Sequence, residues 1–96
     1  MAARIENITT VLESETKAVM LRFLQAELEI AKTFINVANA TLLVENRERT
    51  RQQARKAYDT VVRMMSRVKL SGGEKALLSN RLAEVKTALQ QLGEKF

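Results

Sequence analysis

The chain has 96 residues, of which 46% are apolar, so it is long enough for one small globular domain and too short for two. Its formal net charge is +5, and it contains no cysteine, no histidine and no proline. Without cysteine and histidine, disulfides, the usual metal sites and most catalytic arrangements are excluded. We therefore expect no enzyme activity, no catalytic residues, no cofactor, no metal site and no small-molecule substrate.

The spacing of apolar residues indicates helices. They recur at intervals of three and four residues rather than alternating as in strands. Few turns are available, because the only glycines are Gly72, Gly73 and Gly93. The sequence thus predicts an all-α fold, an antiparallel three-helix bundle that forms a single domain over residues 1–96.

The N-terminal segment, residues 1–14, repeats Ile5, Ile8 and Leu12 at intervals of three and four. This spacing predicts a short amphipathic helix. We expect the segment either to pack on the helix that follows or to be mobile. It has no continuous apolar run of the kind found in secretory signals, so we expect a cytoplasmic protein. The longest uncharged stretch, residues 33–44, is far shorter than the ~20 residues of a membrane span.

The first long helix is expected over residues 15–44 and carries two apolar seams. The first seam contains Leu21, Leu24, Leu28, Ala31, Ile35, Ala38 and Leu42. The second contains Val19, Phe23, Ile30, Phe34, Val37 and Val44. Together they form an arc wider than the stripe of an ordinary surface helix, so this helix needs two neighbours, which the other two helices can supply.

The lengths of the helices point to an uncovered end. The first helix is about 43 Å long at 1.5 Å per residue, whereas the other two are about 33 and 29 Å. If all three align at the Asn46 end, then Val19, Met20 and Phe23 protrude. Exposed apolar patches usually mark contacts. We expect the N-terminal segment or a second copy to cover these residues, in preference to a different protein.

The second helix is expected over residues 47–69, after a turn at Asn46; a kinked or continuous helix at that point is the alternative. Its predicted core positions are Ala54, Tyr58, Val61, Met65 and Val68. Glu27 and Glu45 fall on the apolar side of the first helix, so we expect the arginines that open the second helix to pair with them.

The third helix is expected over residues 73–92. Ser71 and Glu74 have the spacing of a capping box at its start, and Gly93 supplies the stop at its end. Phe96 is expected to fold back over that end. Its core positions repeat at 4-3-4-3 spacing: Leu78, Leu82, Val85, Leu89 and Leu92.

Most of the positive charge lies on the second helix. Residues 47–69 hold eight basic and two acidic side chains, a net charge of +6. Four of the basic residues form a predicted solvent-facing stripe: Arg49, Lys56, Arg63 and Arg67. Such a stripe can follow nucleic-acid phosphates, but no exposed aromatic residue accompanies it for base stacking. A solvated face or a protein contact is the favoured interpretation.

Two helical families show a similar style of packing. The small-aromatic-small pattern in the first two helices resembles the hairpins of tetratricopeptide-type repeats: Ala31, Phe34 and Ala38, then Ala54, Tyr58 and Val61. The match covers about 40 residues, without the helix-ending proline or a second repeat. The three-helix outline is also similar to microtubule-interacting and trafficking domains. Both resemblances imply peptide binding in helical grooves and no enzyme activity.

The sequence alone thus favours a small, non-catalytic protein–protein interaction or assembly module, with self-association as a homodimer one form of it. The alternative is a nucleic-acid-binding accessory protein that uses the basic second helix.

Overall fold

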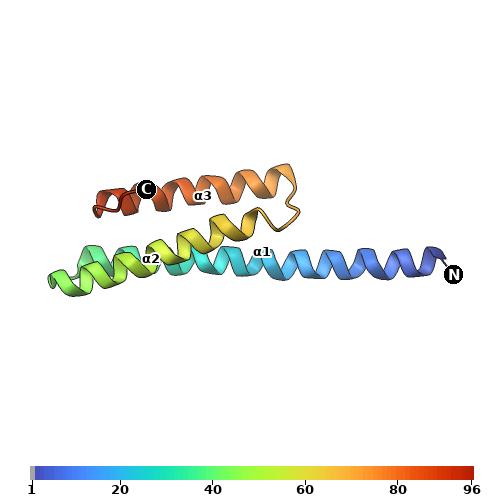
Figure 1. The fold of residues 1–96 in the computed structure, drawn as a ribbon, viewed down its shortest axis with the longest axis horizontal. Helices are drawn as coiled ribbons and strands as arrows, with labels where there is room; N and C mark the ends of the chain where they lie inside the picture. The colour runs from blue at the N-terminus through green and yellow to red at the C-terminus, as the bar shows by residue number, and fades with distance from the viewer. Residues whose placement is uncertain (1) are drawn as a thin grey trace.

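The computed structural model describes the backbone of residues 2–96 and the side chains of residues 15–96. Within this part of the chain there are three helices, α1 (Ala2–Ala40), α2 (Val44–Met65) and α3 (Gly72–Gln91). Successive helices run in opposite directions, and α3 contacts both α1 and α2 (Figure 1). The predicted all-α antiparallel three-helix bundle is confirmed.

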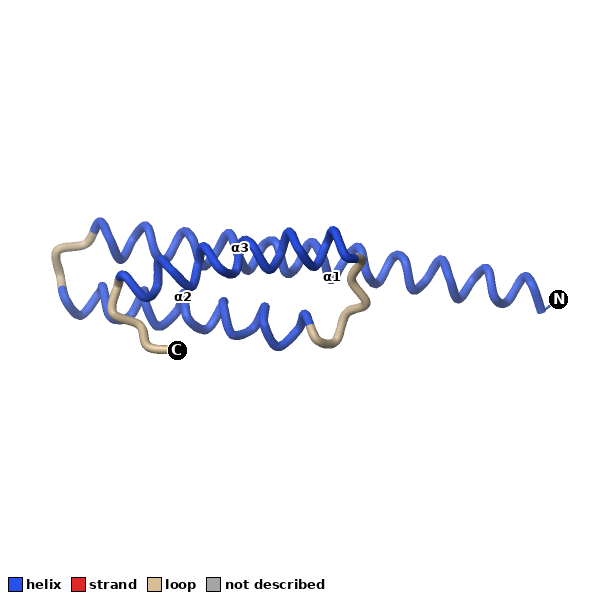
Figure 2. Tube along the Cα trace, turned by 90° about the horizontal axis from the view of Figure 1, so that it is seen from above, coloured by secondary structure: helices blue, strands red, loops and turns tan. Residues whose placement is uncertain are grey.

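The N-terminal segment is not a separate short helix, because residues 2–14 form the first part of α1. Residues 2–40 contain no glycine or proline, so no helix-breaking residue separates this segment from the rest of α1. The segment therefore does not fold back over α1. It continues beyond the ends of α2 and α3 (Figure 2), and the molecule measures 64 × 20 × 16 Å.

The connection between α1 and α2 comes earlier than expected. It consists of residues 41–43, so the predicted turn at Asn46 is wrong, and so is the extension of the first helix to residue 44. Leu43 is the N-cap of α2 and has no side chain that can cap the helix, which is why the sequence gives no signal there. Leu42, assigned to the first seam, is 93% exposed at the tip of the hairpin.

The core is built mainly by α1 and α2, whose contact is the most extensive of the three, and α3 closes it. From the first seam, Leu24 and Leu28 are fully buried. Small residues bring the two helices close together. The buried core comprises Leu24, Leu28, Ala31 and Ile35 of α1, Ala54, Ala57 and Val61 of α2, and Leu78, Leu82, Val85 and Leu89 of α3. Phe34 and Tyr58, the predicted hairpin anchors, are half-buried against it.

The third helix begins and ends as predicted to within one residue. The Glu74 amide donates to Ser71 Oγ at 3.2 Å, and the Ser71 amide donates to Glu74 Oε1 at 2.8 Å, so the capping box is present. Gly93 ends the helix with a φ of 97°, in the left-handed region. By contrast, α2 stops at Met65 rather than at residue 69, and the connection of residues 66–71 carries the chain to α3.

One ion pair shows the register between the first and last helices. Lys17 Nζ of α1 lies 2.8 Å from Glu74 Oε1 of α3. The start of α3 is therefore level with Lys17, and residues 2–14 extend past it by about 20 Å at 1.5 Å per residue.

Candidate functional site

An exposed apolar stripe runs along α1 on the side away from the core. Its apolar members are 40–58% exposed: Val19, Phe23, Ile30 and Val37. Ala26 and Thr33 fall between them and are also exposed. We call these six residues the outer stripe. They are spaced 4-3-4-3-4, which places them on one face of a helix.

The outer stripe is the part of the predicted second seam that α2 and α3 leave uncovered. The two seams are centred about a third of a turn apart on α1 at 100° per residue, so neighbours that cover Leu24 and Leu28 leave Val19 and Ile30 exposed. Phe34 sits nearer the core edge and is half-buried. Val44 is exposed at the start of α2 and does not belong to the stripe.

The residues predicted to protrude are placed differently from expectation. Val19 and Phe23 are exposed, but Met20 is half-buried. None of the three lies beyond the end of the bundle, because α3 begins level with Lys17. Val19 and Phe23 are exposed because they face away from the core. The estimate from helix lengths placed the end of the bundle too early, because the connection before α3 extends past the end of α2.

The four basic residues of the second predicted surface are all exposed. Arg49, Lys56 and Arg63 lie seven residues apart on the outer face of α2, opposite the buried Ala54 and Val61. None of the three forms an ion pair with any other described residue. Arg67 was predicted to lie on the second helix, but α2 ends at Met65. It follows the last turn of α2, where its amide donates to the Met64 carbonyl at 3.0 Å.

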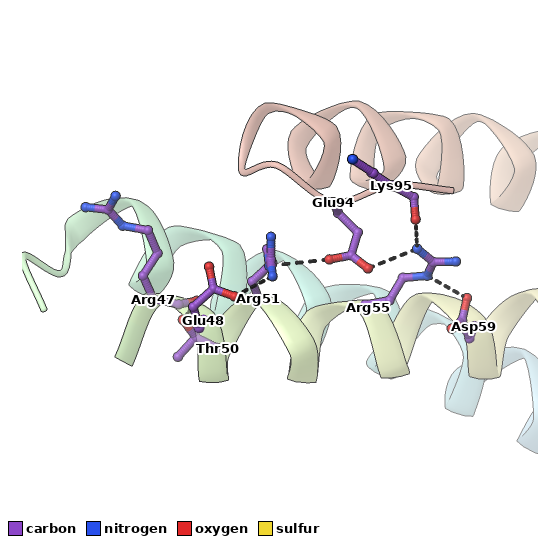
Figure 3. Close-up of polar contacts among 8 residues, drawn as sticks. All are labelled: Arg47, Glu48, Thr50, Arg51, Arg55, Asp59, Glu94 and Lys95. Atoms are coloured by element: carbon purple, nitrogen blue, oxygen red, sulfur yellow. Dashed lines mark hydrogen bonds and ion pairs between the residues drawn. The ribbon is translucent and has the colours of Figure 1, made fainter. Parts of the chain in front are cut away.

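Two other arginines of α2 bind the C-terminal segment (Figure 3). Arg55 Nη1 donates to Glu94 Oε1 at 3.0 Å and to the Lys95 carbonyl at 2.8 Å. Arg51 Nε lies 3.4 Å from Glu94 Oε2, and its Nη2 pairs with Glu48. The Glu94 side chain is only 18% exposed, so one largely buried carboxylate connects the end of the chain to α2.

Phe96 completes this attachment. Its ring contacts the Tyr58 ring edge-on at a centroid distance of 5.1 Å, and the Arg55 guanidinium lies over it at 3.9 Å. The carboxylate of Asp59, followed by that of Glu94, raises the pKa of Arg55 above its usual value. Phe96 does fold back, as predicted, but its ring packs on Tyr58 and Arg55, which belong to α2. The role of Glu94 was missed, because no local spacing links residues 39 positions apart.

The predicted partners of the arginines are wrong. Glu45 lies in the first turn of α2 and is exposed, where a carboxylate favours the helix dipole. Glu27 is half-buried and forms no ion pair with the described residues. The prediction for Glu45 failed because it continued the first helix to residue 44, whereas α1 ends at Ala40 and Glu45 belongs to α2.

The described residues contain no group of three or more acidic side chains that could hold a metal ion. A shallow hollow of about 410 Å³ on α3 is lined by Ala83, Glu84, Thr87, Ala88 and Gln91, and so offers one carboxylate and no basic side chain. No helix in the described part of the chain is both long and apolar enough to cross a membrane.

The comparisons with known proteins identify no relative: no family model, curated protein or solved structure matches the chain.

Proposed function

We propose that the protein is a small, non-catalytic interaction or assembly module of the cytoplasm, and that its binding surface is the outer stripe of α1. The observation that carries this proposal is the exposure of Val19, Phe23, Ile30 and Val37 on one face. Scattered exposed apolar residues are normal on a soluble domain, but a continuous row of them marks a contact surface.

The shape of the surface favours a helical partner. Apolar residues at alternating intervals of four and three are the pattern along which one helix packs against another. The stripe lies on the convex outer surface of a helix and not in a pocket, so a protein segment fits it better than a small molecule does.

A photo-reactive amino acid at Ile30 tests the proposal. In cells of the source organism we expect discrete protein adducts at this position, including adducts with a second copy. The same group at Gln90, an exposed position on α3, is the matched control. Adding Phe23→Glu to the Ile30 probe should abolish the adducts. Absence of adducts at Ile30, or equal adducts at Gln90, would contradict a binding role for the outer stripe.

We keep nucleic-acid binding by α2 as a second candidate, because Arg49, Lys56 and Arg63 are exposed and are not used in ion pairs with described residues. With Arg67 they offer four positive charges. If all four contact phosphates, the association constant should fall with a log–log salt slope of about −3.6, or about 10²-fold between 50 and 200 mM salt.

Binding to single-stranded and duplex oligonucleotides at about 50 mM salt tests this candidate. The fourfold change of Arg49, Lys56, Arg63 and Arg67 to glutamate should abolish binding. Lys75→Glu on α3 is the control for a change in charge alone. If the unaltered protein does not bind at this salt concentration, the candidate is eliminated.

A further inference from the structure

The side-chain sizes along the outer stripe restrict which helix can pack against it. It presents two β-branched aliphatic residues of similar size, Val19 and Ile30, and one large ring, Phe23, beside the smallest side chain, Ala26. A partner helix that runs alongside must place small residues against the ring and larger ones against the alanine.

We propose that the occupant is a second copy of this chain, with the two α1 helices antiparallel and the two-fold axis between positions 24 and 25. The proposal rests on the function proposed for the outer stripe. In this register Val19 faces Ile30 of the second copy, and Phe23 faces Ala26. The symmetry repeats each contact, so the interface is built twice from the same residues.

The polar members of the stripe also match in this register. Thr33 faces Thr16, which is exposed on the same side of α1. A parallel, in-register pair would instead stack Phe23 on Phe23 and Ala26 on Ala26, with a bulky layer next to a gap. The antiparallel register keeps the volume of successive layers nearly equal, and equal layers pack without voids.

Charges along one edge of the stripe support the same register. Arg22 precedes Phe23 and Glu29 precedes Ile30, so both flank the stripe on the same side. In the antiparallel pair, Arg22 of each copy faces Glu29 of the other, which gives two equivalent ion pairs. Within one copy Glu29 has only an exposed contact with Lys32 at 3.8 Å, so its carboxylate is accessible to a second cation.

The extension of α1 accounts for the length of the interface. In this register positions 9 to 40 of the two helices lie side by side over about 47 Å. A contact about 10 Å wide then covers roughly 500 Å² on each copy, near the lower limit for a specific interface. The backbone of residues 2–14 is brought alongside the hairpin tip of the second copy, where Leu42 and Leu43 are 93% and 64% exposed. We therefore expect a dimer that dissociates on dilution.

Introduced cysteines report the register directly, because the chain has none of its own. We expect a disulfide when Val19→Cys and Ile30→Cys are mixed and oxidised. Each variant alone should not cross-link. In this register the same position on the two copies is separated by 11 residues along the helix axis, or about 16 Å, which is too far for a disulfide. Cross-linking of each variant with itself would show a parallel pair and overturn the proposal.

A charge exchange provides a second test. Arg22→Glu places like charges together twice and should raise the dimer dissociation constant about tenfold in sedimentation equilibrium. The double variant Arg22→Glu with Glu29→Arg should restore it to within about threefold. Arg49→Glu makes the same charge change on the outer face of α2 and serves as the control.

A wild-type protein that remains monomeric up to about 1 mM, with no disulfide in the mixed sample, would also overturn the proposal. That result leaves the proposed function intact if the Ile30 photo-probe still traps a different protein. If the photo-probe traps nothing, the binding function itself fails. The two failures are therefore distinguishable.

Discussion

The guanidinium of Arg55 lies between the carboxylate of Glu94 and the ring of Phe96, at 3.0 Å from Glu94 Oε1 and 3.9 Å from the ring centroid. One arginine of α2 thereby fixes the segment that follows α3. Because Arg51 contacts the same carboxylate, two of the eight basic residues in the second predicted helix have a structural role. The basic residues of α2 thus include an inner pair that holds the C-terminal segment and an outer row that faces solvent.

Glu94→Gln should destabilise the protein. It leaves Arg51 and Arg55, which are only 19% and 26% exposed, without their shared carboxylate. We expect the free energy of unfolding to fall by about 1–3 kcal/mol, the range for breaking a charge-assisted contact in a partly buried place. Urea unfolding at fixed protein concentration measures it. Glu84→Gln, an exposed acid on α3, should change stability by less than about 0.5 kcal/mol. Equal effects of the two variants would contradict the role of Glu94.

Glu74 should make stability depend on pH in the acid range. The Lys17 ammonium and then the Ser71 amide donate hydrogen bonds to its carboxylate, and they lower its pKa from 4.5 to about 2. Because the folded-state pKa is the lower one, the contribution is fully present above pH 4.5 and is lost as the pH falls toward 2.

Thermal unfolding between pH 6 and 2 measures this dependence. Relative to the unaltered chain, Glu74→Gln should show a smaller loss of stability below pH 4.5, because it has no carboxylate to protonate. Lys17→Met should reduce the same dependence in part, since the capping contact with Ser71 remains. A pH profile that Glu74→Gln leaves unchanged would show that the two contacts do not stabilise the folded state.

Leu28 and Ile30 lie two positions apart on α1 and face opposite ways. Leu28 is fully buried, whereas Ile30 is 41% exposed. Leu28→Ala should lower the free energy of unfolding by about 2–5 kcal/mol, because it leaves a cavity in the core. In a monomer, Ile30→Ala should lower the free energy of unfolding by well under half of that amount. Urea denaturation at low protein concentration, where the chain is monomeric, measures both effects.

The same pair separates folding from association. At high concentration Ile30→Ala should lose additional stability, because dimerisation stabilises the folded state by mass action. Leu28→Ala should show no such added loss beyond its effect on the fold. A concentration-independent effect of Ile30→Ala would argue against the dimer.

The sequence predicted the parts of the fold that depend on local patterns. The capping box of Ser71 and Glu74, the stop at Gly93 and the buried row of α3 follow from spacing alone. The structure contains all of them, except that Leu92, the last residue of the predicted row, is only partly buried. The start of α2 was not predictable in the same way, because its N-cap, Leu43, carries no capping side chain.

The candidate surface was predicted in part, and for an incomplete reason. The second apolar seam indicated that α1 needs more cover than one neighbour provides, and Val19 and Phe23 are exposed. Periodicity does not tell which seam the bundle will bury, since both seams are apolar. That choice depends on contacts distant in sequence, such as the packing of Leu78 and Leu82 of α3 into the core that α1 and α2 form.

Two glycines provide a final contrast. Gly93 has a φ of 97°, and a Cβ placed there would lie 3.4 Å from Nη1 of Arg51. Because an L-residue in the left-handed region costs about 1–2 kcal/mol, Gly93→Ala should destabilise the protein by about that amount. A Cβ at Gly73, in the first turn of α3, meets nothing within 4 Å. Gly73→Ala should therefore stabilise the protein by about 0.4–1 kcal/mol, mainly by restricting the unfolded chain. Urea midpoints for the two variants should move in opposite directions. An unchanged or raised midpoint for Gly93→Ala would show that the stop at Gly93 does not depend on its backbone conformation.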